Sequence, residues 1–337
     1  NSLSRPDTVK KLLDYTIEDI SETTDEDNLQ YPYIACEIFC CEINSICEVV
    51  TTNLDFINKY WEVLDKPQIS PLVASNFSRV NSVLFQRRLA DMFAFIRDRP
   101  DSLKKILNHI SNPAIAELLL KFITLEDLPD GSEISEWLTE QGLIDFFIDQ
   151  LNPNLSTETH SVAAQALLDI IAISYQNVTP DILNGSDYIS ENQSESNLSV
   201  KNVCGNSLML FLKSRDIMDR LLEYMLVTDA ENRVSTLTNC VNIIMELIRR
   251  YCSEIEQVEY QQHKYLEMKG PPPSEAKLRY LATDLNSFLC AIGDKIQDLA
   301  NLLKAEPKEN KINTTMGLMQ PLGPERLKLC ELFAEIL

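Results

Sequence analysis

The residues whose types and spacing most suggest chemistry are four cysteines close together in the sequence, Cys36, Cys40, Cys41 and Cys47. Cys36, Cys40 and Cys47 fall on one side of a single predicted helix, with Glu37 and Glu42 beside them. Thiolates and carboxylates so placed could hold a metal ion, but no Cys-x-x-Cys pair occurs. A buried free thiol also packs as a small apolar side chain. We therefore predict a packing role here, without a metal or a cofactor.

The other residues suited to catalysis are scattered. His109, His160 and His263 lie far apart in the chain, and each is more typical of a surface or capping position than of a general base. The acidic stretch 22–27 lacks the alternating oxygen ligands and the central glycine of a calcium loop. No His-Glu-x-x-His, Gly-x-Ser-x-Gly, Walker or dinucleotide motif is present. The sequence therefore predicts a protein that is not an enzyme.

The elements that would position any site are predicted to be helices. Between Leu89 and Leu151, apolar residues recur four times at i, i+3, i+4 and i+7, which is typical of a helix with one buried face. Asn112 and Pro113 precede the third of these segments and suit the N-cap and the first helical position. Short helices of this kind need one another to bury their apolar faces.

The repeated pattern predicts the fold class. Leu103 and Ile144 begin two equivalent stripes 41 residues apart, which is within the spacing of HEAT and armadillo repeats. Further helices are expected at 4–20, 32–51 and 54–64, and the stripe returns near residues 163, 244 and 329; no strand alternation is evident. We predict an all-α fold, an α-solenoid of degenerate HEAT/armadillo-like repeats. It forms one domain over 1–337, with loop-like insertions near 184–199 and 263–275.

Composition limits the classes of partner. The 337 residues carry a net charge of −21, which disfavours both nucleic acid and an anionic membrane surface. No apolar run is long enough to span a bilayer. The odd count of nine cysteines, several within predicted helices, fits a reducing compartment. We expect a cytoplasmic protein, with the nucleus as an alternative.

Several separated segments resemble one known family. They are Pro-Tyr-Ile-Ala-Cys-Glu-Ile at 32–38, Pro-Leu-Val-Ala-Ser-Asn-Phe-Ser-Arg-Val at 71–80, the helix entry at 111–120, Thr-Thr-Met-Gly-Leu at 314–318 and Gly-Pro-Glu-Arg-Leu at 323–327. In this order they resemble a fungal member of the SAPS-domain family, over about residues 4–337. Its members associate with the yeast Sit-four phosphatase, and their animal relatives are regulatory subunits of protein phosphatase six.

The resemblance implies a non-catalytic subunit that binds the catalytic subunit of a type-2A-like serine/threonine phosphatase and directs it to substrates in cell-cycle and nutrient signalling. Two alternatives stay open at this stage. One is an unrelated α-solenoid adaptor in trafficking or transport. The other is an α-helical enzyme, which would need a cavity lined by convergent polar groups.

The partner-binding face is predicted from scarce cations. Arginine is favoured at interface hot spots, and basic residues are few in this chain. The predicted partner-binding residues are Asn76, Arg79, Arg87, Arg88, Arg97, Lys104, Lys121 and Arg326. The alternative is that the arginines only balance nearby acids such as Asp91 and Asp98.

Overall fold

The computed structural model describes residues 3–18, 26–176, 206–268, 275–304 and 311–336. Within these ranges the side chains of 26–29, 175–176 and most of 251–287 are not described. The chain forms two compact units, residues 1–141 and 142–337. Within the described ranges, no helix is both long enough and apolar enough to cross a membrane.

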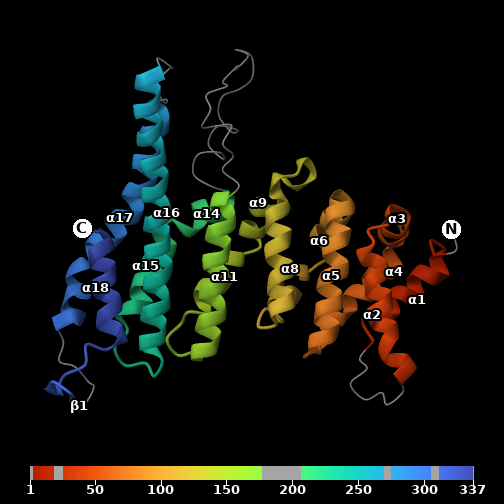
Figure 1. Cartoon of the computed structure of the whole chain (residues 1–337), viewed down its shortest axis with the longest axis horizontal. Coiled ribbons are helices and arrows are strands. Elements are labelled where there is room, and N and C mark those ends of the chain that lie inside the picture. The colour runs from red at the N-terminus through yellow and green to blue at the C-terminus, as the bar shows by residue number, and fades with distance from the viewer. Residues whose placement is uncertain (1–2, 19–25, 177–205, 269–274, 305–310, 337) are drawn as a thin grey trace. The chain divides into compact units, whose positions relative to one another are not determined.

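The first unit is built from short helices in close succession (Figure 1). They are α1 (Pro6–Thr16), α2 (Glu26–Cys40), α3 (Asn44–Thr52), α4 (Leu54–Trp61), α5 (Pro71–Arg87), α6 (Leu89–Asp98), α7 (Ser102–Leu107), α8 (Pro113–Thr124) and α9 (Ile134–Glu140), with 3₁₀ turns at Glu62–Asp65, Leu125–Asp127 and Pro129–Gly131. The start of α8 confirms the predicted cap. The Asn112 side chain accepts a 3.0 Å hydrogen bond from the Ala114 N–H, and Pro113 is the first helical residue.

Within this unit α5 packs between α2 and α8 (Figure 1). The stripe of α8 is buried as predicted, and the Phe122 ring lies 5.1 Å from that of Phe85 in α5. Trp137 of α9 meets Phe122 edge-on. Aromatic rings thus fill the space between successive helices, where edge-to-face contacts add to the gain from apolar burial.

The helix predicted over 32–51 is in fact two helices. α2 begins at Glu26 and ends at Cys40, and α3 starts at Asn44. Between them Glu42 adopts a left-handed conformation with φ of 55°, which ends the first helix. Cys47 therefore lies on a different helix from Cys36, and the predicted single row of cysteines does not exist.

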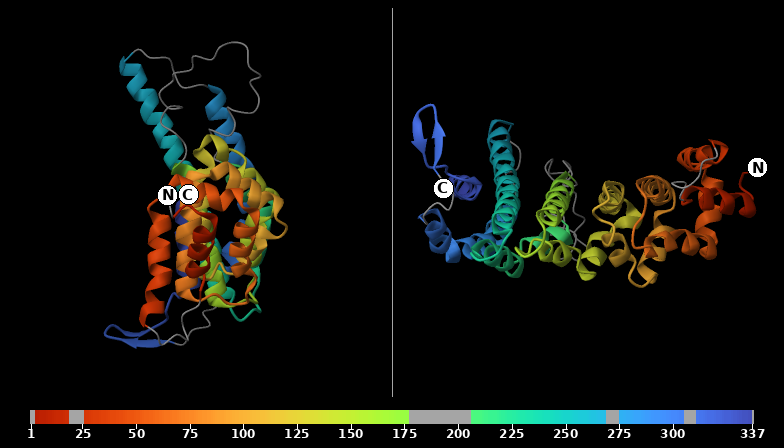
Figure 2. Two further views of the ribbon diagram at one scale, coloured as in Figure 1. Left: turned by 90° about the vertical axis from the view of Figure 1, so that its right-hand side faces the viewer. Right: turned by 90° about the horizontal axis from the view of Figure 1, so that it is seen from below.

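The second unit is also built from helices, of which α16 and α17 are the longest. They are α10 (Leu143–Asp149), α11 (Thr157–Gln176), α14 (Ser207–Leu212), α15 (Arg215–Leu226), α16 (Arg233–Met268), α17 (Glu275–Lys304) and α18 (Pro324–Ile336). α16 packs between α11 and α18, and α15 packs against α16 and α17 (Figure 2). The described residues of both units thus confirm the predicted all-α helical-repeat class.

Two local expectations need correction in this unit. Strands β1 (Ile312–Thr314) and β2 (Gly317–Met319) form a small antiparallel hairpin before α18, where no strand was predicted (Figure 2). Three-residue strands are too short for alternation to identify them. Residues 263–268, placed in a loop by the sequence, continue helix α16. The insertion predicted at 184–199 lies outside the described residues.

Candidate protein-binding surface

Helices α2 and α5 of the first unit run parallel and are joined by two ion pairs. Ser70 caps α5 and Pro71 starts it, and the helix places Arg79 and Arg87 on one face, two turns apart. Arg79 donates a 2.7 Å hydrogen bond to Glu37 in α2, and Arg87 donates to Glu42 just after that helix. Both pairs follow the same order along the chain, as expected for two parallel helices.

These pairs have a defined electrostatic effect. The hydrogen bond to Glu37 raises the pKa of the Arg79 guanidinium, so its charge is held more firmly. The side chains of Arg79 and Glu37 are 41% and 43% exposed, a degree at which an ion pair contributes little to stability. A partner could therefore replace the internal carboxylate at small cost.

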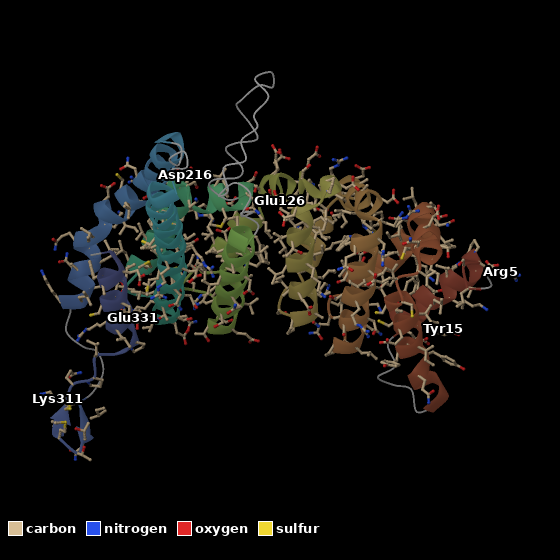
Figure 3. The ribbon with its side chains drawn as sticks, turned by 45° about the horizontal axis from the view of Figure 1, so that its top comes forward. Arg5, Tyr15, Glu126, Asp216, Lys311 and Glu331 are labelled. Atoms are coloured by element: carbon tan, nitrogen blue, oxygen red, sulfur yellow. The ribbon has the colours of Figure 1, made fainter. Side chains whose placement is uncertain are left out.

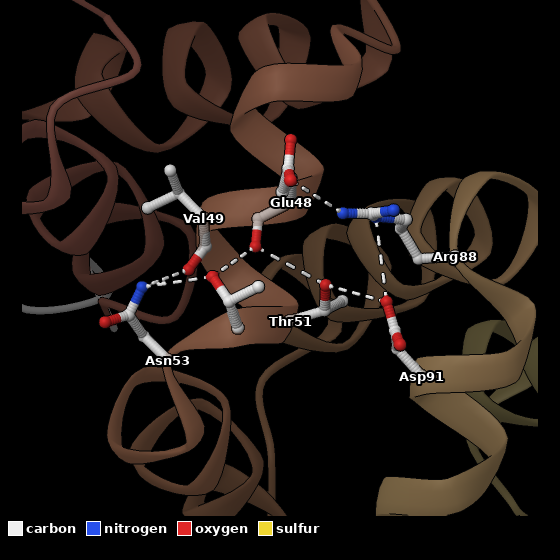
Figure 4. A network of polar contacts seen from close by, with 7 residues as sticks. Glu48, Val49, Thr51, Asn53, Arg88 and Asp91 are labelled. Atoms are coloured by element: carbon white, nitrogen blue, oxygen red, sulfur yellow. Dashed lines mark hydrogen bonds and ion pairs between the residues drawn. The ribbon is translucent and has the colours of Figure 1, made fainter.

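Arg88 belongs to a looser network between α3 and α6 (Figure 4). Its guanidinium lies 3.5 Å from Glu48 and 3.7 Å from Asp91, both longer than the pair made by Arg79. Its Nε atom is buried and, among the described residues, has no hydrogen-bond acceptor. Thr51 donates a 3.3 Å hydrogen bond to Asp91 and so holds that carboxylate in place. Of the paired arginines in this surface, Arg88 is held least tightly.

Arg97, Lys104 and Lys121 lie elsewhere on the first unit. Arg97 pairs with Glu133 at 3.2 Å and covers the Phe93 ring, and Lys121 pairs with Glu117 one turn earlier in α8. Lys104 is exposed and forms no ion pair with the described residues.

Besides these three, Asn76 and Arg326 also lie apart from Arg79, Arg87 and Arg88. Asn76 is buried and donates a 3.3 Å hydrogen bond to the Thr16 carbonyl, so its side chain serves the core of the first unit. Arg326 lies in α18 of the second unit. The structure therefore groups Arg79, Arg87 and Arg88 at neighbouring helices, and we call these three the arginine surface.

The same two helices carry exposed apolar side chains that were not predicted. Tyr33 and Ile34 in α2 and Leu72 in α5 are exposed, although apolar side chains on helices are usually buried. Tyr31, also exposed, stacks on Tyr15 with ring centroids 5.2 Å apart. Tyr33 and Ile34 fall outside the buried stripe of α2, which contains Ala35, Cys36 and Phe39.

Two histidines, His109 and His160, and three cysteines, Cys36, Cys47 and Cys240, are buried in the fold. His109 is buried near the Leu64 carbonyl, and His160 is fully buried between Asn152 and Ser235. The prediction of surface or capping positions was wrong for both, because their ring nitrogens satisfy polar groups inside the fold. The side chain of His263 is outside the described residues. The described cysteines are all free thiols, and no described cluster of His, Cys, Asp or Glu has the geometry of a metal site.

A pocket of about 230 Å³ lies between α1 and α4. Its polar lining includes Lys59 and Asp14, which pair with each other at 2.7 Å. Lys10, Asp55 and Tyr60 complete the polar part of the lining. Side chains over both units are drawn in Figure 3, including Glu126 in the first unit and Glu331 in the second.

The fold and this surface define a class: an all-α helical-repeat protein that presents charged and apolar side chains along packed helices. Residues 81–337 match the model of the family described as SIT4 phosphatase-associated protein, SAPS. The chain therefore belongs to the SAPS family, which confirms the resemblance seen in its sequence motifs. Membership of this family decides against an unrelated trafficking adaptor.

Three relatives extend the comparison. Extragenic suppressor of kinetochore protein 1 of Schizosaccharomyces pombe is 30% identical over 99% of this chain and 38% of its own length. Serine/threonine-protein phosphatase 6 regulatory subunit 3-A of Xenopus laevis is 25% identical over 99% of this chain and 36% of its own length. The SIT4-associating protein SAP190 of Saccharomyces cerevisiae is 27% identical over 90% of this chain and 26% of its own length.

The chain thus spans well under half the length of these relatives. The Xenopus laevis relative is named as a phosphatase regulatory subunit and the Saccharomyces cerevisiae relative as a phosphatase-associating protein, and neither is named as a catalytic subunit. No solved structure matches the chain.

Proposed function

We propose that this chain is the helical-repeat part of a non-catalytic regulatory subunit, and that it binds the catalytic subunit of a SIT4-type or phosphatase-6-type serine/threonine phosphatase. The observation that carries the proposal is the family match over residues 81–337, together with relatives named for this association. The proposed role is to hold the catalytic subunit and direct it to substrates.

The packing of the chain supports such a role. Helical-repeat proteins use extended rows of helices as binding surfaces, and each row is rigid because neighbouring helices bury one another's apolar faces. The parallel helices α2, α5 and α8 form a row of this kind in the first unit. A rigid surface loses little conformational entropy on binding, which favours affinity.

Within this proposal, the arginine surface contacts the catalytic subunit. Arg79, Arg87 and Arg88 are cations in a chain of net charge −21, and their internal partners are exposed carboxylates. A carboxylate of the catalytic subunit can compete for such a guanidinium, especially that of Arg88, whose internal contacts are long. The exposed Tyr33 and Ile34 on α2 add apolar contact area on the same helices.

Titration calorimetry of residues 1–337 with a purified phosphatase-6-type catalytic subunit tests the proposal. We expect one-to-one binding with a Kd at or below about 1 μM, and no comparable binding to a type-1 phosphatase catalytic subunit. In a parallel assay, a phosphopeptide should be hydrolysed only when the catalytic subunit is present. Absence of binding, or hydrolysis by this chain alone that changes with its point variants, would overturn the proposal.

A further inference from the structure

The hairpin before α18 has a well-defined turn. Ile312 pairs with Met319, and Thr314 pairs with Gly317. The Thr314 hydroxyl donates a 2.8 Å hydrogen bond to the Gly317 carbonyl and accepts one of 3.2 Å from the Met316 N–H. Gly317 has a φ of 106°, which a residue with a side chain rarely adopts. These features hold Met316 at the tip of the hairpin.

Apolar side chains of this hairpin point into solvent. Met316 is 88% exposed, Leu318 is 65% exposed and Ile312 is 52% exposed. Leu318 lies on the face of the hairpin opposite to Ile312, so neither face is covered. A two-stranded hairpin alone in water is only marginally stable, and exposed apolar side chains add no stability. An uncovered apolar hairpin of this kind is typical of a segment that is completed by a binding partner.

The hairpin is mounted on a fixed element. Residues 320–323 connect β2 to α18, and Glu325 near the start of α18 accepts two 2.7 Å hydrogen bonds from Arg233 in α16. Side chains of this pair are mostly shielded from solvent. The base of the hairpin is therefore anchored to the helical layer. Lys311, labelled in Figure 3, is exposed and leads into β1.

The charge of the hairpin and of the whole chain favours one kind of binding partner for the hairpin. Over residues 311–323 the sequence contains a single charged side chain, Lys311, whereas the whole chain has a net charge of −21. A second copy of the chain would bring the same large negative charge, and an anionic bilayer would repel the molecule in the same way. A different protein with an apolar pocket and a nearby carboxylate matches both the apolar tip and Lys311.

We infer that the 311–323 hairpin is a docking element that inserts Met316 and Leu318 into an apolar pocket of the phosphatase catalytic subunit, with Lys311 facing a carboxylate beside the pocket. The inference rests on the proposed function and adds a contact within the second unit. Methionine suits this role because its flexible thioether adapts to an irregular pocket. Well-buried apolar anchors of this kind carry a large share of binding energy at protein interfaces.

The test compares calorimetric Kd values for the catalytic subunit between chain 1–337 and three variants. Met316→Asp/Leu318→Asp should weaken binding at least about tenfold, since it places two charges in an apolar pocket. Met316→Leu keeps an apolar side chain and should stay within about threefold of the unaltered chain. Leu54→Asp alters a leucine that is 60% exposed on α4 in the first unit, and it should leave the Kd unchanged.

Melting curves should coincide for all four proteins, because the altered side chains are exposed. Equal Kd values for the unaltered chain and the double-aspartate variant would overturn the inference and leave the proposed function standing. Failure of the unaltered chain to bind would overturn both. Two other results, each combined with equal Kd values, would assign the hairpin to a different occupant. One is a dimer of the unaltered chain in sedimentation that the double variant does not form. The other is binding of the unaltered chain to vesicles that the double variant loses.

Discussion

Arg233 in α16 and Glu325 in α18 form a two-fold hydrogen-bonded ion pair, with both N···O distances at 2.7 Å. Their side chains are only 16% and 18% exposed. The pair joins two parallel helices of the second unit, as Arg79 and Glu37 join α2 and α5 in the first. Because the Arg233 pair is shielded from water and uses both guanidinium branches, we expect it to be the stronger of the two.

A double-mutant cycle tests this difference. Arg233→Met or Glu325→Gln alone should lower the free energy of unfolding by about 1.5 to 3 kcal/mol, because one charged partner stays shielded without its mate. The corresponding cycle on Arg79 and Glu37 should give a coupling energy below about 1 kcal/mol. Urea unfolding of the single and double variants measures both. Equal coupling energies in the two cycles would contradict the expectation.

The second prediction concerns Asn81, in the core of the first unit. Asn81 is fully buried, accepts a 3.0 Å hydrogen bond from Trp61 Nε1 and donates one of 2.8 Å to the Phe77 carbonyl. Asn81→Ala should cost about 1 to 3 kcal/mol, since it leaves the indole N–H without an acceptor. Gln86→Ala, at an exposed site on the same helix, serves as the control. A melting temperature of Asn81→Ala equal to that of the control variant would show that the hydrogen bonds are replaced.

The third prediction concerns the buried face of α8. Leu119 is 2% exposed, so Leu119→Asp places a carboxylate in apolar surroundings and should cost several kcal/mol. Leu72→Asp makes the same change at an exposed position on α5 and should be nearly neutral. Circular dichroism melts of the two variants provide the comparison. Similar melts would mean that the α8 face is not buried.

Cys36 makes stability depend on pH in the alkaline range. Burial, and next the nearby Cys40, raise the pKa of the Cys36 thiol from its ordinary value of 9.0 to about 12. Below pH 9 the thiol is neutral in both states, and its contribution to stability is fully present. As the pH rises from 9 towards 12, the unfolded chain loses the proton first, so stability falls by up to about 1.4 kcal/mol per pH unit.

Urea unfolding between pH 8 and pH 10.5 measures this slope. Cys36→Ala should reduce the slope of the unfolding free energy against pH, whatever the substitution does to stability at pH 8. Cys41→Ala, at an exposed cysteine just beyond the end of α2, should leave the slope as it is in the unaltered chain. An identical slope in all three proteins would remove Cys36 from the alkaline response.

A charge swap separates binding from packing at the arginine surface. Arg87→Glu faces Glu42 with a like charge, whereas Arg87→Glu/Glu42→Arg restores an opposite pair between the same positions. If Arg87 contacts a carboxylate of the catalytic subunit, both variants should weaken the Kd by about tenfold. High salt should reduce the difference, because exposed charges are screened. A swap variant with the Kd of the unaltered chain would limit Arg87 to holding α5 against α2.

Much of the helical architecture could be predicted from the sequence because its causes are local. Apolar spacing from Ile115 to Phe122, together with Asn112 and Pro113, specifies where α8 begins and which face it buries. The apolar spacing likewise indicates the buried faces of α6 and α18. Family membership was also accessible, since its motifs are short segments read in order along the chain.

Only the tertiary structure decided the partners of the charged residues. Arg79 meets Glu37 and Arg87 meets Glu42 across more than 40 positions of sequence, and no local pattern encodes such a pairing. The tertiary structure also places Asn76 in the core, although its polar side chain alone predicted an exposed position.

Apolar periodicity in the sequence could predict neither the hairpin nor the break after α2. Strands of three residues give no measurable alternation, and a single left-handed residue at Glu42 divides a continuous apolar pattern. The sequence by itself determined the helices, through hydrogen bonds and apolar faces that depend on residues within a few positions. The tertiary structure decided which side chains are shielded, paired or left exposed, because burial and charge pairing depend on neighbours that are distant along the chain.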